Sequence, residues 1–180
     1  MVALALLGAG AYHWSGRFEE RVARTLAFTR GDEAAIDFAL AGRLPIWRTA
    51  VGMAAAHPVN GVGVRGFRYA YPAHAAPGDP WVQTDTNTGA LHAHQLVLEL
   101  LAETGIVGLL AWCAAAFVLW RAHRRVRGDA RTLAWAPGVA LLAMAFPLNT
   151  HFAFYSAYWG LVFWWLLALH AAALATREGR

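Results

Sequence analysis

Residues 104–120 read TGIVGLLAWCAAAFVLW and contain no charged side chain. About 17–25 mostly apolar helical residues cross the hydrocarbon core of a bilayer, so this segment is long enough to span it. Two later segments have the same character: TLAWAPGVALLAMAFPLNT at 132–150, and a Trp-rich stretch at 152–175 that begins FAFYSAYWG. The sequence therefore predicts membrane-spanning helices at about 104–120, 132–150 and 152–175, within a C-terminal region covering residues 95–180.

The composition of the 180 residues agrees with a membrane protein. Hydrophobic residues make up 58% and charged residues 14%, whereas soluble domains average about 45–50% and about 25%. This balance excludes intrinsic disorder, which requires low hydrophobicity and high charge. The single cysteine, Cys113, excludes an internal disulfide and a zinc site built from several cysteines.

The arginines indicate which way the helices point. Residues 121–131, RAHRRVRGDAR, carry five arginines and one aspartate between the first two spans. The positive-inside rule places this short loop in the cytoplasm, and the basic tail TREGR agrees with that. Residues 14–94 then lie outside, as a loop with eight arginines and seven acidic residues. We therefore attribute the net charge of +4 to topology and expect no nucleic-acid partner.

The first residues add a further candidate span. Val2–Tyr12 is apolar but too short to cross a bilayer alone, so we interpret residues 1–13 as a partial transmembrane helix. No basic residue precedes it and no small-residue cleavage site follows, which argues against a signal peptide. The chain is thus predicted to be an all-α polytopic membrane protein with three to four transmembrane helices and a large, partly helical outer loop.

The outer loop, residues 14–94, is too long for a simple connector, and long loops are often functional. Interleaved apolar and charged residues over Arg17–Leu40 predict a helix lying on the membrane surface. A second helix is predicted from about Leu44 to His57, because Pro45 suits a first turn and Pro58 follows the end. The loop is therefore expected to be partly helical.

The second half of the outer loop leads into the first long span. Residues 72–89 are rich in Pro, Gly, Asp, Thr and Asn, which predicts irregular loop. A third helix is expected to begin near His92 or His94 and to stop or bend at Gly105. A polar stripe with a spacing of four residues runs along this helix, formed by Gln95, Glu99 and Glu103.

His94 lies off this stripe, at the predicted start of the helix. At the predicted helix start, free backbone N–H groups and the helix dipole attract phosphate and favour neutral imidazole over imidazolium. Neutral imidazole is the form that a general base needs. The alternative is a structural histidine that caps the helix or bonds a neighbouring carbonyl group.

Two spaced motifs resemble the bacterial O-antigen ligases and the related Wzy-type polymerases and protein O-oligosaccharyltransferases. The first motif is an arginine, a tryptophan and a P-x-x-G-x-G-x-x-x-F run, matched by Arg43, Trp47 and PVNGVGVRGF at 58–67. The second is His followed by Asn, Ser or Gln, then nine residues and Gly-x-x-Gly, matched without a gap by HQLVLELLAETGIVG at 94–108. FPLNTHFAFYS and the Trp-rich span also resemble the family's last helix pair, so the resemblance extends from residue 40 to the C-terminus.

This resemblance implies a membrane glycosyltransferase of the multi-pass type, in the bacterial inner membrane with its active-site loop in the periplasm. Such an enzyme moves a glycan from an undecaprenyl-diphosphate carrier to an acceptor hydroxyl, which for a ligase belongs to lipid A–core. A polysaccharide polymerase or a protein O-oligosaccharyltransferase is the alternative with the same kind of donor. Family members have more spans and a further functional arginine in an earlier loop, so we expect this chain to be an incomplete fragment.

The resemblance also assigns the site residues. It makes His94 catalytic and Arg43 a ligand of the diphosphate, and we add Arg65 and Arg68 as candidates for phosphate or lipid headgroups. The supporting positions are Trp47, Gln95, Glu99, Glu103, Gly105 and Gly108. A guanidinium binds phosphate oxygens in pairs, and a neutral histidine can take the acceptor proton. We therefore expect no metal and no other cofactor.

Two other interpretations of these residues fit the sequence less well. A zinc site at His92 and His94 would need His74 or Asp85, and no spaced third ligand is evident. Residues 61–66 match G-x-G-x-x-G, but no apolar strand precedes them, so we interpret them as a tight turn and not as a dinucleotide site.

The two glutamates of the polar stripe do not fit a glycosidase pair. Glu99 and Glu103 share one helix face and would lie on one side of a sugar, so we assign them to orienting a His or Arg partner. For the whole chain, a non-catalytic membrane component of polysaccharide assembly is the alternative from another class of protein.

Overall fold

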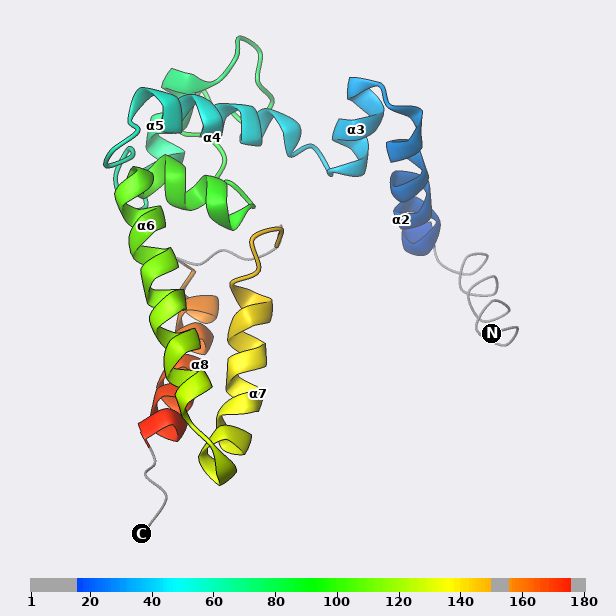
Figure 1. Cartoon of the computed structure of the whole chain (residues 1–180). Coiled ribbons are helices and arrows are strands. Elements are labelled where there is room, and N and C mark those ends of the chain that lie inside the picture. The colour runs from blue at the N-terminus through cyan, green and yellow to red at the C-terminus, as the bar shows by residue number, and fades with distance from the viewer. Residues whose placement is uncertain (1–15, 150–155, 176–180) are drawn as a thin grey trace, which may run out of the picture. The chain divides into compact units, whose positions relative to one another are not determined.

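The computed structural model describes residues 16–149 and 156–175, and the regular elements in these ranges are helices. In this part of the chain the only extended pairing is an isolated antiparallel bridge between Gln83 and Thr88. The predicted all-α fold is therefore confirmed (Figure 1). The predicted partial span at 1–13 lies outside the described residues.

The chain divides into two compact units, residues 1–46 and 47–180. In the first unit, α2 (Gly16–Ala27) leads through the short 3-10 helix η1 (Phe28–Arg30) to α3 (Glu33–Ala39). Gly31 has a φ of 74°, a left-handed conformation that ends η1 and redirects the chain. The single helix predicted over Arg17–Leu40 is therefore wrong, because the glycine divides it into a packed helix pair.

The next helix, α4 (Leu44–Ala56), begins and ends where the prolines predicted. Pro45 occupies its first turn, where the missing N–H group is not needed by the helix. Thr49, Ala50 and Met53 are buried along it. The prediction of a helix from about Leu44 to His57 is confirmed.

A short helix, α5 (Phe67–His74), contains Pro72, so the prediction of irregular loop from residue 72 is wrong at its start. Proline has no N–H group and leaves the carbonyl group four residues earlier without its helical partner. That carbonyl belongs to Arg68, and it accepts a hydrogen bond of 2.8 Å from the Gly89 N–H group. The returning loop thus replaces the bond that proline removes, which explains why the helix tolerates it.

The long helix α6 (Leu96–Arg125) is divided at Gly105, whose φ of 63° and ψ of −161° are not helical. The short first part, 96–104, turns away from the long second part, 106–125 (Figure 1). We treat the second part as the membrane-spanning part, because charged residues are absent from 106 to 120. The helix begins at Leu96, and not near His92 or His94 as predicted, because Gln95 caps it.

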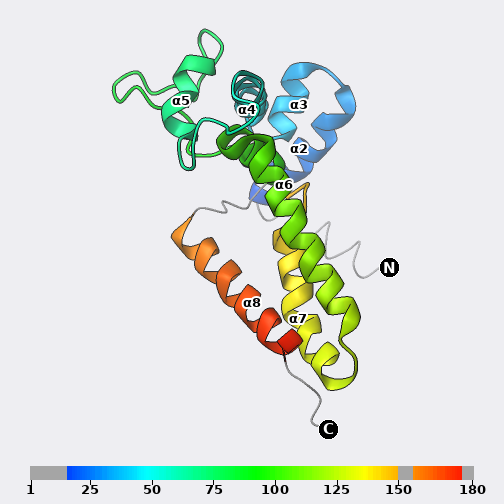
Figure 2. The same ribbon diagram turned by 60° about the vertical axis from the view of Figure 1, so that its left-hand side comes forward.

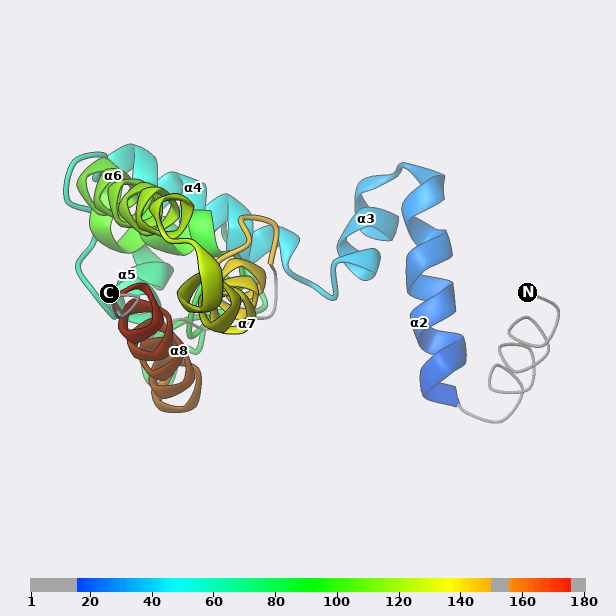
Figure 3. The same ribbon diagram turned by 60° about the horizontal axis from the view of Figure 1, so that its bottom comes forward.

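Two further helices complete the second unit, α7 (Gly128–Met144) and α8 (Ala157–Ala175). They pack against each other, and α8 also contacts α6. Figure 2 shows α7 running opposite to α6 and α8, and Figure 3 shows α7 and α8 side by side. His170 joins the pair, since its Nδ1 lies 3.0 Å from the Ala134 carbonyl oxygen and its ring faces Gly138.

By length and hydropathy, two helices in the described part of the chain can cross a membrane: α6 and α8. Helix α7 has 17 residues with Pro137 inside it, and it ends at Met144 rather than at residue 150. Large apolar side chains on α6 and α8 face outward, with Leu161 at 73% exposure and Trp164 at 62%. Water would penalise such surfaces, whereas hydrocarbon accepts them, so they fit helices that stand in lipid. The predicted count of three to four spans stays a prediction.

Candidate functional site

The two motifs found in the sequence meet at the break in α6. We name residues Pro58–Phe67 the glycine loop. Its backbone bonds to the groups that the break exposes: the Ile106 N–H group donates to the Pro58 carbonyl at 2.9 Å, and the Val62 N–H group donates to the Ala102 carbonyl at 2.8 Å. Since a broken helix leaves N–H and C=O groups without helical partners, the loop satisfies groups that would otherwise be orphaned.

Glycine is required on both sides of this contact. A Cβ atom on Gly61 would overlap the backbone at Glu103, and a Cβ atom on Gly105 would overlap the Val59 carbonyl group. Both residues also have left-handed φ values, of 64° and 63°. The first glycine of each motif is therefore required because two backbones approach each other closely at this point.

Gly108, the last glycine of the second motif, has a different neighbour. A Cβ atom there would overlap the side chain of Thr104, whose hydroxyl donates to the Leu100 carbonyl at 2.6 Å. The threonine therefore occupies the space that a larger residue at position 108 would need. Gly105 therefore forms the bend, and Gly108 leaves the room that the Thr104 side chain needs beside it.

Glu103 anchors the glycine loop from α6. Its side chain is 2% exposed, and its two carboxylate oxygens accept hydrogen bonds from the backbone N–H groups of Arg65 and Phe67, at 2.8 and 3.3 Å. The expected arginine partner of Glu103 is therefore Arg65, but the hydrogen bond comes from the backbone and not from the guanidinium.

Glu99 lies one turn earlier, before the membrane-spanning part of α6, and is also 2% exposed. Its Oε2 atom has no hydrogen-bond partner among the described residues. Burial, with a smaller contribution from the negative charge of Glu103, raises the pKa of Glu99 to about 8. The His or Arg partner predicted for Glu99 is not found at this oxygen, and the structure instead favours a neutral carboxylic acid.

His94 occupies an unusual backbone conformation, with a φ of 52°. Left-handed conformations are rare for residues other than glycine, and they cluster at functional sites. The centroid of its ring lies 3.9 Å from that of His92, with the planes at 64°. His94 itself is half-buried and lies two residues before the first turn of α6.

The N-terminal cap of α6 is Gln95, whose Oε1 accepts a hydrogen bond of 2.6 Å from the Leu98 N–H group. The alternative in which His94 caps the helix is therefore wrong. His94 was predicted to stand at the helix start, but the helix begins two residues after it, at Leu96, because Gln95 takes the capping position. Gln95 Nε2 also donates to the Pro147 carbonyl at 2.5 Å, which ties this segment to the connection between α7 and α8.

Trp47 fixes the histidine segment from the side of α4. Its indole Nε1 donates a hydrogen bond of 3.0 Å to the carbonyl group of Ala93, between the two histidines. The supporting role predicted for Trp47 thus has a geometric basis, because the bond holds the backbone next to His94.

The three candidate arginines have different settings. Arg65 is exposed in the glycine loop with a φ of 60°. Arg68 lies in α5 with its guanidinium 4.9 Å from the ring of Tyr69, and its Nε has no hydrogen-bond partner in the described residues. Arg43 is half-buried just before α4 and belongs to the first unit. The approach of Arg43 to His94 stays a prediction.

A buried polar cluster was missed by sequence reasoning. Tyr71 is fully buried, and its hydroxyl donates to Asp79 at 3.1 Å and is hydrogen-bonded to Thr49. Burial raises the pKa of this hydroxyl, which therefore stays protonated. Asp79 also accepts from the Trp81 N–H group at 2.8 Å. The spacing of Phe67 and Tyr71 at i and i+4 was the signal that could have identified this cluster.

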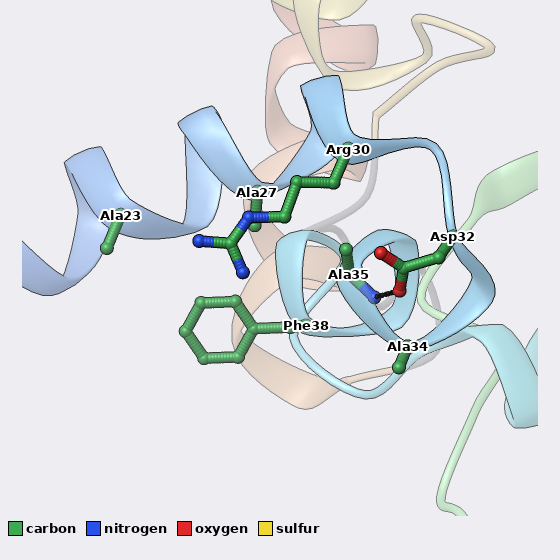
Figure 4. Close-up of a pocket in the computed structure, with 7 residues that line it drawn as sticks. All are labelled: Ala23, Ala27, Arg30, Asp32, Ala34, Ala35 and Phe38. Carbon is green, nitrogen blue, oxygen red and sulfur yellow. Dashed lines mark hydrogen bonds between the residues drawn. The ribbon is translucent and has the colours of Figure 1, made fainter.

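A pocket lies between α2 and α3 in the first unit, and no predicted site residue lines it (Figure 4). Arg30, Asp32 and Phe38 line it together with alanines, and Asp32 accepts the capping hydrogen bond from Ala35 at 2.8 Å. Within the residues that the structure describes, no three His, Cys, Asp or Glu side chains form a group suited to a metal ion. Metal independence stays a prediction.

The two long apolar helices, with large apolar side chains on their outer faces, are those of a membrane protein. The family model described as O-Antigen ligase matches residues 1–113, more than half of the chain, and the protein belongs to this family. Its function is accordingly of the O-antigen ligase or polymerase type. No curated protein and no solved structure matches the chain.

The family match begins earlier than the resemblance found in the sequence and ends before it. It covers both motifs and extends to residue 1, but it stops at residue 113. The likeness of FPLNTHFAFYS and the Trp-rich span to the family's last helix pair therefore stays a prediction.

Proposed function

We propose that this chain carries the acceptor-activating and diphosphate-binding residues of a glycosyltransferase at the periplasmic face of the inner membrane. The donor is a glycan on undecaprenyl diphosphate, and the acceptor is a hydroxyl group of lipid A–core. His94 takes the acceptor proton, while Arg43, Arg65 and Arg68 neutralise the diphosphate leaving group.

One observation carries this proposal. The backbone contact between the glycine loop and the break in α6 brings Arg65 and the α6 motif into one assembly, and Trp47 holds the segment that contains His94. The backbone of His94 has a φ of 52°, and its two neighbours are held by the bond from Trp47 to Ala93 and by the cap at Gln95. A fixed backbone of this kind suits a residue that acts as a general base. Arginine suits the other task because its planar fork matches two phosphate oxygens.

The test compares four variants in the full-length, membrane-inserted protein, with donor binding and turnover measured separately. His94→Ala is expected to lower turnover by about 10²–10⁴-fold with donor binding nearly intact. Arg43→Ala is expected to weaken donor binding as well as rate, and Arg43→Lys to restore only part of both, because an ammonium group cannot bind bidentately.

His92→Ala is the control, because its ring lies beside that of His94 but is not the proposed proton acceptor. We expect a much milder loss from it. Near-normal turnover of His94→Ala, or an equal loss in His92→Ala, would show that His94 is not the general base.

A further inference from the structure

We propose that the Glu103 carboxylate is a built-in anion that fills the backbone cradle of the glycine loop and thereby positions Arg65 for the donor diphosphate. This inference rests on the proposed function, in which Arg65 contacts the diphosphate. It makes Glu103 a positioning residue, which acts through Arg65 and not on the substrate itself.

The glycine loop has the backbone shape of an anion site. Left-handed conformations recur at Gly61, Gly63 and Arg65, with φ values of 64°, 101° and 60°. Such residues turn neighbouring N–H groups toward a common side, and phosphate occupies that side in the loops of many nucleotide-binding proteins. Here the anion comes from the protein, since the N–H groups of Arg65 and Phe67 both donate to the Glu103 carboxylate.

Three further N–H donors of the loop are used as well. The N–H groups of Val62 and Gly63 donate to the carbonyl groups of Ala102 and Glu103, at 2.8 and 3.0 Å, and the Gly66 N–H group donates to the Gly63 carbonyl at 2.9 Å. A phosphate that entered the cradle would have to displace a buried carboxylate from two charge-assisted hydrogen bonds. The donor must therefore be held by side chains, and Arg65 is the arginine that the cradle fixes.

A carboxylate is needed at this position because two N–H groups converge on it. Glutamine offers one carbonyl oxygen, and its NH₂ group would face the second N–H donor. The neighbouring Glu99 does not compete for the role, since its Oε2 makes no hydrogen bond within the described residues. Among the described residues, the N–H groups of Arg65 and Phe67 donate to the carboxyl group of Glu103.

The backbone conformation of Arg65 is a second reason why this residue needs to be held in place. A non-glycine residue in the left-handed region is disfavoured and persists only where its surroundings fix it. The hydrogen bond from the Arg65 N–H group to Glu103, at 2.8 Å, provides that fixation from a helix. Loss of the bond frees the loop to relax, and the guanidinium then has to be ordered again when the donor binds, which weakens binding.

The experiment is a double-mutant cycle between Glu103→Gln and Arg65→Ala in the membrane-inserted protein, with KM for the lipid-linked donor and kcat measured for each variant. Glu103→Gln is expected to raise KM on the order of tenfold, since a charge-assisted bond is lost, with a much smaller change in kcat. In the Arg65→Ala background the same substitution is expected to change KM by less than about twofold, because coupled residues are not additive. Glu19→Gln, at an exposed glutamate of α2, is the control for charge removal.

Amide hydrogen exchange provides the second readout, which does not depend on activity. Glu103→Gln is expected to accelerate exchange in peptides covering residues 62–68 and to leave residues 47–56 of α4 unchanged. If Glu103→Gln fails to insert, Glu103→Asp replaces it, since aspartate keeps the charge but shortens the reach. The same acceleration and the same coupling to Arg65 are then expected.

The outcomes separate this inference from the proposed function. Additive effects on KM, or unchanged exchange at residues 62–68, overturn the positioning role of Glu103. If Arg65→Ala alone leaves the donor KM unchanged, then the assignment of Arg65 to the diphosphate fails, and with it the positioning of Arg65 for the donor. Accelerated exchange would still support the cradle in that case.

Discussion

Two glutamates one helical turn apart, Glu99 and Glu103, differ in what faces their carboxyl oxygens. Glu103 meets two N–H donors, whereas the Oε2 atom of Glu99 has no hydrogen-bond partner in the described residues. Burial without a donor disfavours charge, and a second carboxylate close by disfavours it further. Burial therefore raises the pKa of both side chains, but the N–H groups of Arg65 and Phe67 act against this rise at Glu103, and Glu99 is the one that the structure keeps neutral.

This difference predicts how stability depends on pH. The pKa of Glu99 is raised from 4.5 to about 8 in the folded protein, so between these values the unfolded chain releases a proton that the folded chain keeps. The contribution of Glu99 to the free energy of unfolding is fully present below pH 4.5 and is lost as the pH rises through 8. Glu99→Gln, which stays neutral, is expected to flatten this part of the profile and to be more stable than the natural protein at pH 8.

Thermal unfolding in detergent between pH 4.5 and 8 measures this effect. An unchanged slope of melting temperature against pH in Glu99→Gln would show that the carboxyl group of Glu99 is ionised in the folded protein. The exposed Glu19→Gln variant serves as the control for any general effect of charge on the detergent complex.

Gly105 is expected to tolerate no side chain. Its φ and ψ of 63° and −161° fall in a region that essentially only glycine adopts, and a Cβ atom would also overlap the Val59 carbonyl group. Conformational strain of about 1–3 kcal/mol is then added to a backbone clash, so Gly105→Ala should destabilise the protein by more than about 3 kcal/mol. Thermal unfolding and the yield of inserted protein check this.

Gly63 gives the matched control. It has a φ of 101°, but a Cβ atom there meets nothing within 4 Å. Gly63→Ala is therefore expected to cost only the strain, about 1–2 kcal/mol. Equal melting temperatures for the two alanine variants would contradict the close approach at the α6 break.

At the scale of the elements, local signals predicted some boundaries well and others poorly. Prolines marked both ends of α4, because proline acts on the chain next to it. The same residue type misled at Pro72, since the bond that repairs α5 comes from Gly89, far along the chain. Compensation from a distant segment leaves no local trace in a sequence.

The sequence identified individual residues of the candidate site better than it identified the contacts between them. The spacing of the second motif identified His94 and Gly105, and the polar stripe identified Glu103. The structure places Glu103 and Gly105 against the glycine loop. The sequence could not show that Glu103 binds backbone N–H groups rather than a side chain, because hydrogen-bond partners depend on the fold of both segments. The cap at Gln95 was missed for a related reason, since its spacing also fitted a polar stripe.

At the scale of the whole molecule, the distribution of arginines predicts which side of the membrane holds the glycine loop. Five arginines between α6 and α7 predict a cytoplasmic turn, and residues 14–94 are then periplasmic. Once Cys113 is replaced, Thr84→Cys is expected to react with a membrane-impermeant thiol reagent in intact spheroplasts. Arg127→Cys is expected to react only after permeabilisation, and its labelling from outside would reverse the topology.

The backbone bonds between the glycine loop and the α6 break also set the order in which this protein can mature. During synthesis residues 58–63 leave the ribosome before residues 102–107, which carry their hydrogen-bond partners. The loop therefore emerges as an open chain and closes only when the start of α6 arrives beside it. A nascent chain halted before this point has Arg65 but not the glutamate that holds it, so the glycine loop can close only once the start of α6 has been synthesised.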